Sequence, residues 1–324
     1  MKVAPTPRVT VVTGPLGAGK TTLVNAWLSQ FARGDVAVIV NEFGDVGVDG
    51  ELLAERAREV VELTGGCVCC ATQADLVRAL IEMASRPSPP RRVIIETSGA
   101  ASPAGVVRSL TRGPVSRRMG LDGVITVVDA TRTERVRDSL LCGEQVAYAD
   151  VVVLTRADAC APDALREAGA LIAARNPAAA IAHAARGAVV TPAAATLDAL
   201  LAARGEDFNA PWALVRAEAG THDAGIESVS LTHDGALDGD RFSAWVEHWV
   251  EEMGGRLMRV KGILAVATVP VRVVLQCVGD SVEVSFGAPW GDAPPRSRMV
   301  LIGYGLDADG LRAGFAACAT ITTH

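Results

Sequence analysis

Residues 9–21 read VTVVTGPLGAGKT: a short β-branched run, a glycine-rich turn and the first residues of a helical segment. Gly14, Gly19, Lys20 and Thr21 have the full spacing of a P-loop. Glycines let the main chain wrap closely around a phosphate, and the positive end of the following helix faces the same oxygens. The alternative, a glycine-rich turn with an incidental lysine, leaves the strand before it and the helix after it unexplained. We therefore predict a phosphate-binding loop, with Lys20 at the β- and γ-phosphates and the Thr21 hydroxyl on Mg²⁺.

Outward from this loop, short apolar runs alternate with helical patterns as far as Arg204. Buried runs separated by helices indicate a mainly parallel sheet that is covered on both faces. The expected strands are Val9 to Thr13, Val36 to Val40, Glu59 to Leu63, Arg92 to Glu96, Gly123 to Val128 and Val151 to Leu154. The expected helices include Lys20 to Phe31, Gln73 to Ala84 and Pro162 to Ala174. The fold class predicted for residues 1–205 is therefore α/β, a P-loop three-layer domain with a mainly parallel sheet.

The pattern changes after Arg204. Residues 206–225 have no clear period and read as a linker. Residues 226–324 then carry strand-like runs in succession with two helical patterns, which predicts a smaller α+β domain with a mainly antiparallel sheet. Its expected strands are Glu227 to Thr232, Leu257 to Thr268, Val271 to Val278, Val282 to Phe286 and Met299 to Ile302, and its expected helices are Asp240 to Met253 and Asp307 to Cys318.

Composition narrows the class of protein. Hydrophobic residues make up 49% and charged residues 21%, which is typical of a globular chain, and the formal net charge is -6. The nearest basic run, Arg86 to Arg92, is broken by prolines and reads as a loop before a strand, so we expect no nucleic-acid partner. No apolar stretch reaches the roughly 18 residues of a membrane span, and Met1 to Arg8 lacks a signal-peptide core. We expect a cytoplasmic protein with no membrane partner.

Two acids follow predicted strands. Glu96 ends one strand and is followed by Thr97, Ser98 and Gly99, which places a carboxylate and a flexible glycine at the edge where such sheets bind ligands. We predict that Glu96 joins Thr21 on the Mg²⁺ side; the alternative is a helix cap or a surface acid. For Asp129, which ends another strand, the same two interpretations remain equally open.

Thr155, Arg156 and Asp158 follow the strand that ends at Leu154, where many GTPases carry Asn-Lys-x-Asp. A carboxylate accepts hydrogen bonds from the ring N–H and the amine of guanine, whereas adenine presents an acceptor at the ring position. A buried mismatch of this kind discriminates by about 10⁴. Asp158 therefore predicts a preference for guanine, with the stem of Arg156 covering the base and Thr155 reaching less far than asparagine. Residues 184–186 are a weak candidate for the loop behind the base.

Cysteines are clustered at one place. Three of the seven, Cys67, Cys69 and Cys70, lie within four residues after a glycine pair, and thiolates this close form a soft-ligand metal site. A fourth ligand must come from elsewhere: Glu42, a water or a client protein. Buried small residues and a redox role are the alternatives. The four remaining cysteines, which lie singly in apolar segments, are expected to be core thiols: Cys142, Cys160, Cys277 and Cys318.

Together these motifs resemble the metallochaperone-type GTPases that include the cobalamin-synthesis protein CobW and zinc chaperones. The segments that carry the resemblance are Gly14 to Thr22, Asn41 to Gly50 as a first switch, Gly65 to Cys70 as the Cys-x-Cys-Cys motif, Glu96 to Gly99 as a second switch, and Arg259 to Gly262 with Arg298 to Gly303 in the C-terminal domain. The resemblance covers nearly the whole chain.

The resemblance implies that the chain binds GTP or GDP with Mg²⁺, hydrolyses GTP, and holds Zn²⁺, Co²⁺ or Fe²⁺ at the cysteine motif. The metal would pass to a client metalloprotein or to an enzyme of cofactor biosynthesis. Lys20, Thr21 and Glu96 would be catalytic, and Glu42 would join the metal site. The residues expected to hold the nucleotide are Gly14, Gly17, Ala18, Gly19, Lys20, Thr21, Thr22, Gly99, Thr155, Arg156 and Asp158.

Two departures from the family pattern bear on function. The base motif reads Thr-Arg-Ala-Asp, and the histidine-rich stretch often found between the domains is reduced to His222 and His233. The first hypothesis is an enzyme in which slow GTP hydrolysis gates metal transfer. The second is a metal sensor or interaction module that binds nucleotide with little turnover. A third, a P-loop kinase, is disfavoured by the cysteine-rich loop and the switch-like segments.

Overall fold

The computed structural model describes residues 6–32, 35–41, 59–62, 71–191, 196–202, 225–279, 281–292 and 294–320. The chain divides into two compact units, each treated separately below. The first comprises Met1–Ile172 and Ala179–Gly205, and the second comprises Ala173–Ala178 and Glu206–His324.

The first unit is built on an eight-stranded sheet in the order β3-β2-β4-β1-β5-β6-β7-β8. Its strands are β1 (Arg8–Thr13), β2 (Val36–Asn41), β3 (Glu59–Glu62), β4 (Arg92–Thr97), β5 (Gly120–Asp129), β6 (Val151–Thr155), β7 (Ala180–Ala185) and β8 (Ala188–Thr191). The pairs from β3 through to β7 are parallel, and only β8 runs antiparallel to its neighbour. The predicted class, a mainly parallel α/β sheet, is confirmed.

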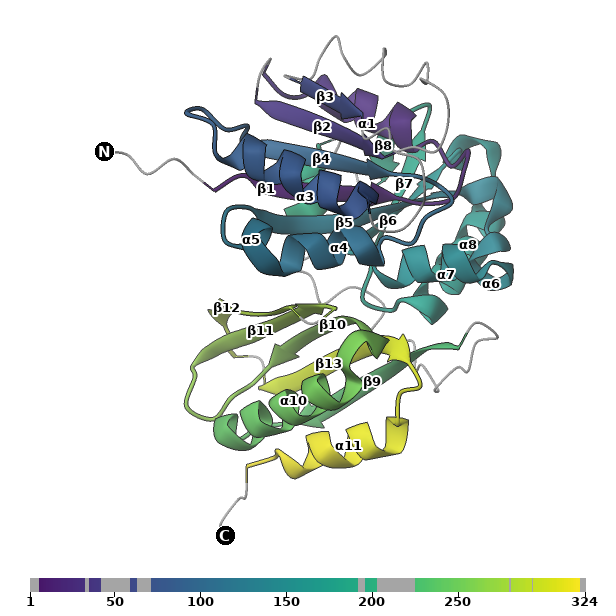
Figure 1. Cartoon of the computed structure of the whole chain (residues 1–324). Helices are drawn as coiled ribbons and strands as arrows, with labels where there is room; N and C mark the ends of the chain where they lie inside the picture. Colours follow the sequence, from purple (N-terminus) through teal and green to yellow (C-terminus); the bar gives the residue numbers. More distant parts are fainter. Residues whose placement is uncertain are drawn as a thin grey trace. The chain divides into compact units, whose positions relative to one another are not determined.

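Helices cover both faces of this sheet (Figure 1). They are α1 (Lys20–Leu28), α3 (Ala71–Ala84), α4 (Ala104–Thr111), α5 (Gly113–Ser116), α6 (Arg135–Asp138), α7 (Leu140–Ala147), α8 (Pro162–Arg175) and α9 (Leu197–Ala202). Apolar side chains of α1 and α9 pack in one core cluster with alternate strand residues such as Val127 and Val153. Their sequence neighbours Val128 and Val152 point to the other face, where α7 and α8 bury them.

The strand order places β1 between β4 and β5, although β2 and β3 come next in sequence. This is the topological switch point of the sheet, and ligands of open α/β folds bind at the carboxyl ends of the strands there. The loops after β1, β4, β5 and β6 meet at this edge because those four strands are parallel neighbours.

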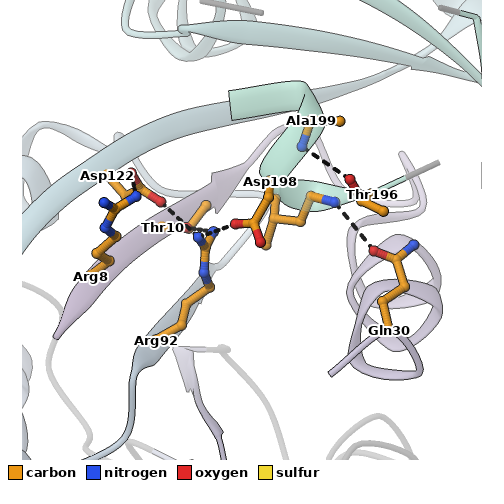
Figure 2. A network of polar contacts seen from close by, with 9 residues as sticks. Arg8, Thr10, Gln30, Arg92, Asp122, Thr196, Asp198 and Ala199 are labelled. Carbon is orange, nitrogen blue, oxygen red and sulfur yellow. Dashed lines mark hydrogen bonds and ion pairs between the residues drawn. The ribbon is translucent and has the colours of Figure 1, made fainter. Parts of the chain in front are cut away.

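A charge network centred on the buried Arg92 lies at the opposite edge of the sheet (Figure 2). The guanidinium of Arg92 donates to the Thr10 hydroxyl at 3.1 Å and forms ion pairs with Asp122 at 3.0 Å and Asp198 at 2.5 Å. These contacts join β4 to β1, β5 and α9. Since Arg92 is buried among acids, it forms no basic patch, in agreement with the interpretation of residues 86–92 as a loop before a strand.

The second unit is a five-stranded antiparallel sheet in the order β12-β11-β10-β13-β9 with two main helices, as predicted. Its elements are β9 (Ile226–Asp234), α10 (Gly239–Met253), β10 (Leu257–Leu264), β11 (Val271–Val278), β12 (Ser281–Pro289), β13 (Arg296–Tyr304) and α11 (Ala308–Ala317). Asp238 and Asp307 cap the two helices through hydrogen bonds of 3.0 Å to main-chain N–H groups. Phe242 and Trp249 of α10 and Phe315 of α11 pack in one core cluster against the sheet.

Several predicted boundaries differ from the structure, and two that were predicted too long have a clear physical cause. The helix after the P-loop ends at Leu28 rather than Phe31, because Gln30 and Phe31 form tight turns onto Trp27 and Leu28. The strand predicted to run to Thr268 ends at Leu264, because the main chain of Ala265 pairs with Ser297 and Leu237 before the chain turns toward Pro270.

Candidate nucleotide-binding site

The P-loop has the main-chain conformation that its glycines predict. Gly14, Gly17 and Gly19 have positive φ angles of 136°, 75° and 94°, a region that side chains other than glycine rarely adopt. A Cβ at Gly14 would also lie 2.0 Å from the Val127 carbonyl oxygen of β5. Lys20 begins α1, and its Nζ donates to the carbonyl oxygens of Gly14 at 3.0 Å and Pro15 at 3.3 Å. The loop therefore closes around the ammonium group beside a helix N-terminus, an arrangement suited to phosphate.

Thr21 and Glu96 meet beside this loop. The Thr21 hydroxyl donates to Oε1 of Glu96 at 2.7 Å, although the two residues lie on α1 and β4. Glu96 is buried. A hydroxyl and a carboxylate are hard oxygen donors of the kind that Mg²⁺ takes, usually through one or two protein groups plus phosphate oxygens. The residues present therefore fit an Mg²⁺–nucleotide complex.

Gly99 is held against the P-loop main chain. A Cβ at this position would lie 2.4 Å from the nitrogen and 2.6 Å from the Cα of Leu16. Its φ is not in the left-handed region, so the requirement for glycine comes from space. The sequence suggested a flexible glycine here; the structure shows a close contact between the second-switch segment and the phosphate loop.

The Thr155 side chain points toward the P-loop and forms a hydrogen bond with it. Its hydroxyl donates to the Ala18 carbonyl at 2.7 Å and lies 3.3 Å from the Val128 carbonyl, and the side chain is buried. The methyl group lies 3.6 Å from the position that a Cβ would take at Gly19. These contacts fix the position of the loop relative to the strand that carries the base motif.

Arg156 forms a bridge that sequence reasoning missed. The residue has a left-handed φ of 54°, its Nη1 pairs with Asp129, and its Nη2 lies 3.4 Å from the Gly17 carbonyl. Asp129 is buried and also accepts hydrogen bonds from Thr131, so it caps the short helical turn that follows β5. Of the two interpretations left open for Asp129, the helix cap is therefore correct. The signal was available in the topology, because Asp129 and Thr155 are paired residues of neighbouring strands.

Asp158 lies on the next turn (Ala157–Ala159), and its Oδ2 is 3.6 Å from Nε of Arg186. Both side chains are exposed, so the ion pair contributes little stability. Arg186 and Gly187 form the turn between β7 and β8, and a Cβ at Gly187 would lie 3.1 Å from Cγ2 of Thr22. The structure thus brings residues 184–186, the weak candidate for the loop behind the base, next to Asp158 and α1.

A small hollow lies between the P-loop and the end of β5. It is lined by Pro15, Leu16, Gly17, Ala18, Val128, Asp129, Arg132 and Arg135. Its charged lining residues are Asp129, Arg132 and Arg135.

The predicted transition-metal site falls outside the described residues. Glu42, Cys67, Cys69 and Cys70 are all in ranges that the structure does not describe. Within the described ranges, no group of three or more His, Cys, Asp or Glu residues is placed to hold a metal ion. The described neighbours are Asn41, which ends β2, and Ala71, which begins α3 directly after Cys70.

The single cysteines divide into two kinds. Cys142, Cys277 and Cys318 are buried, as predicted for core thiols, and burial raises the pKa of Cys277 to about 12. Cys160 is only half-buried, and it packs against the edge of the core cluster that contains Cys142. It follows the short turn that contains Asp158, and its pKa is raised mainly by desolvation and then by Asp129 and Asp158.

Comparison with known families agrees with this geometry. Residues 8–183 match the CobW/HypB/UreG nucleotide-binding domain, and residues 226–319 match the cobalamin synthesis protein cobW C-terminal domain. The chain belongs to the CobW/HypB/UreG family. The resemblance drawn from the sequence motifs is therefore confirmed, and the CobW-type C-terminal domain accounts for the second unit.

Relatives of this CobW-family protein match over nearly its whole length. Zinc chaperone YjiA of Escherichia coli (strain K12) is 32% identical over 320 residues, covering 95% of this chain and 97% of the relative. Zinc chaperone CobW of a Sinorhizobium species is 30% identical over 356 residues, with 95% and 96% covered. The crystal structure of Zn(II)-bound YjiA GTPase superimposes with a TM-score of 0.69 at 27% identity, covering 98% of this chain and 100% of that one.

In the part of the chain that the structure describes, no helix has the length and apolar character needed to span a bilayer.

Proposed function

We propose that this CobW-family protein is a GTP-hydrolysing metallochaperone. It binds a divalent transition metal at Cys67, Cys69 and Cys70, and it delivers the metal to a client under nucleotide control. The observation that carries the proposal is the contact of 2.7 Å between Thr21 and Glu96. This contact joins the P-loop helix to the strand end from which the second-switch segment emerges, so a change at the γ-phosphate that displaces Thr21 would act directly on that segment.

The chain's own residues supply most of what hydrolysis of GTP to GDP and phosphate requires. Amides of the loop from Gly14 to Gly19 hold the phosphates, and the Lys20 ammonium places positive charge beside them. Thr21 and Glu96 would hold Mg²⁺, which would neutralise charge on the phosphate oxygens. Thr155 and the Arg156–Asp129 bridge keep the loop in position while the nucleotide changes.

The choice of guanine rests on Asp158. Its carboxylate accepts from the two N–H groups on the edge of guanine and opposes the ring acceptor of adenine. Arg186 lies 3.6 Å away on the β7–β8 turn, whose Gly187 packs beside Thr22 of α1, so this turn borders the proposed base site.

Zinc is the cargo that the relatives favour, since YjiA and CobW are named zinc chaperones. A set of clustered thiolates also accepts Co²⁺ and Fe²⁺, and intrinsic affinity orders Zn²⁺ above Co²⁺. The client is a metalloprotein or an enzyme of cofactor biosynthesis that presents ligands to the thiolate-bound ion, and Glu42 is the candidate fourth ligand before transfer.

A sensor that binds nucleotide with little turnover is the second candidate, and the base motif favours it. Thr155 and Arg156 replace the asparagine and lysine common in GTPases, and both side chains are engaged by the P-loop and Asp129.

Steady-state GTP hydrolysis with and without one equivalent of Zn²⁺ separates the two candidates. A metallochaperone cycle predicts multiple turnovers whose rate changes when zinc is added, with phosphate release as the readout. Replacing GTP by ATP at the same concentration is the matched control and should reduce turnover strongly. Binding of GTP without turnover in either condition would favour the sensor and contradict the proposed cycle.

A further inference from the structure

We propose that Gln73 is the positioning residue that transmits the nucleotide state of the P-loop to the cysteine motif. It does so by joining the first turn of α3 to the first turns of α4. The inference rests on the proposed function and names the residue on which its nucleotide control depends.

On the side of the cysteine motif, the connection begins at the helix that follows the cysteines in the chain. Helix α3 begins at Ala71, one residue after Cys70, and Gln73 lies in its first turn. Further along the helix, Leu76, Leu80 and Met83 are buried and anchor its body in the core. The first turn of α3, with Gln73, is therefore the part of this helix that follows Cys70 most closely in the chain.

Gln73 is fixed to α4 by two hydrogen bonds. Its Nε2 donates to the Gly105 carbonyl at 3.2 Å and to the Ser109 hydroxyl at 3.0 Å. Ser109 is buried and itself donates to the Gly105 carbonyl at 3.0 Å. Both contacts require a donor at this position, because the Gly105 carbonyl can only accept and the Ser109 hydrogen is already directed at it.

The second end of the connection is the nucleotide site. Helix α4 follows the segment from Ser98 to Pro103, and the Ser102 hydroxyl accepts from the Ala104 N–H at 3.1 Å. Just before this segment, Glu96 of β4 accepts a hydrogen bond from Thr21, and within the segment Gly99 packs against Leu16 of the P-loop. A movement of Glu96 and Gly99 on loss of the γ-phosphate is therefore passed to the start of α4.

The segment between β4 and α4 is also bonded to α7, which restricts the directions in which it can move. Ser102 donates to Glu144 at 2.7 Å, and Gln145 donates to the Ala101 carbonyl at 3.1 Å. These bonds hold the segment to a helix packed in the core. Gln73 binds the side of α4 that carries Gly105 and Ser109. This contact directly connects the second-switch segment to the residues that follow Cys70.

The far end of α3 offers a matched control. There Ser85, just beyond the helix, accepts a hydrogen bond of 2.9 Å from Arg118. This is also a side-chain contact between the region of α3 and the α4–α5 region, but it lies at the opposite end of the helix from Gln73. Ser85→Ala removes it without touching the connection to α4.

The test compares Zn²⁺ affinity with a non-hydrolysable GTP analogue and with GDP in the wild type, Gln73→Ala and Ser85→Ala. Residues along a coupling route change the coupling by about 2- to 30-fold. Gln73→Ala should bring the ratio of the two affinities toward one by that factor, with GDP affinity unchanged because Gln73 contributes no group to the P-loop. Ser85→Ala should keep the wild-type ratio.

A wild-type ratio in Gln73→Ala would overturn the role of Gln73 while leaving the proposed function intact. A ratio of one in the wild type would instead contradict the nucleotide control itself, and the role of Gln73 with it. Gln73→Glu provides a second variant in case alanine destabilises the helix start. It keeps the side-chain shape but replaces the donating amide by an acceptor, so it should lose the coupling at least as fully as Gln73→Ala, and an unaltered ratio in it would also overturn the proposal.

Discussion

Replacing Lys20 by alanine is expected to lower the affinity for GTP by about 100-fold or more, since a charged hydrogen bond contributes about 1.5–3 kcal/mol and the ammonium serves two phosphates. The structure places this ammonium group inside the loop that is expected to hold the phosphates. Nζ of Lys20 is held at the centre of the loop by the carbonyls of Gly14 and Pro15. Equilibrium binding of a fluorescent GTP analogue measures the loss, and phosphate release measures the accompanying loss of turnover.

Ser29→Ala is the control for this variant. Ser29 lies at the other end of α1, is exposed, and bonds only locally to the Ala26 carbonyl at 2.6 Å. It should bind GTP as the wild type does. Lys20→Ala should keep a cooperative thermal transition, because the sheet and its helices do not depend on the ammonium. Hydrolysis by Lys20→Ala at the wild-type rate would refute the assignment of the phosphate site.

Gly99→Ala is expected to reduce GTP turnover by about 100-fold, the effect of a displacement near 1 Å in a catalytic loop. The new methyl group would meet the nitrogen and Cα of Leu16 and the Pro15 carbonyl carbon, all within 2.9 Å. These are main-chain atoms, so no side-chain rotation relieves the overlap. Either the P-loop or the second-switch segment must move, and Glu96 and Thr21 then lose their present spacing.

Gly105→Ala tests whether the effect is specific to that contact. Gly105 lies in α4, and a Cβ there would meet nothing within 4 Å. Alanine in a helix is more favourable than glycine by about 0.5–1 kcal/mol, so this variant should be slightly more stable and should turn over GTP normally. Equal turnover in Gly99→Ala and Gly105→Ala would show that the contact of Gly99 with the P-loop has no functional importance.

The α/β architecture of the first unit could be predicted because its strands carry unbroken apolar runs. Val9 to Thr13 and Val151 to Leu154 are buried in the structure as such runs require. The P-loop could also be predicted, because its spacing of glycine and lysine residues is typical of phosphate-binding loops. Gly14 and Gly19 have the positive φ angles that such a loop requires. The ends of helices and strands were harder to predict, because hydrogen bonds to residues distant in sequence determine them. Ala265, which bonds to Ser297 just after β10, is an example.

The pairing of site residues could not be predicted from local sequence. Thr155 was interpreted through its reach toward a base, whereas its hydroxyl is bound to Ala18 of the P-loop. The bridge from Arg156 to Asp129 depends on the adjacency of β5 and β6, which are separated by a helical segment in the chain. In the same way, the link from Gln73 to Gly105 depends on the packing of α3 beside α4. Such contacts follow from strand order and helix placement, which residue spacing does not specify.

Control of metal affinity by the bound nucleotide can be measured in one titration experiment. Zn²⁺ affinity of the wild-type protein is measured against a competing chelator with a non-hydrolysable GTP analogue and again with GDP. The Cys67→Ala, Cys69→Ala and Cys70→Ala triple variant serves as the control that should lose tight zinc binding and keep nucleotide binding. Zinc should bind about 5- to 150-fold more tightly in the GTP state, and zinc should tighten binding of the GTP analogue by the same factor, because coupling between two sites is reciprocal. Equal zinc affinities in the two nucleotide states would contradict nucleotide control.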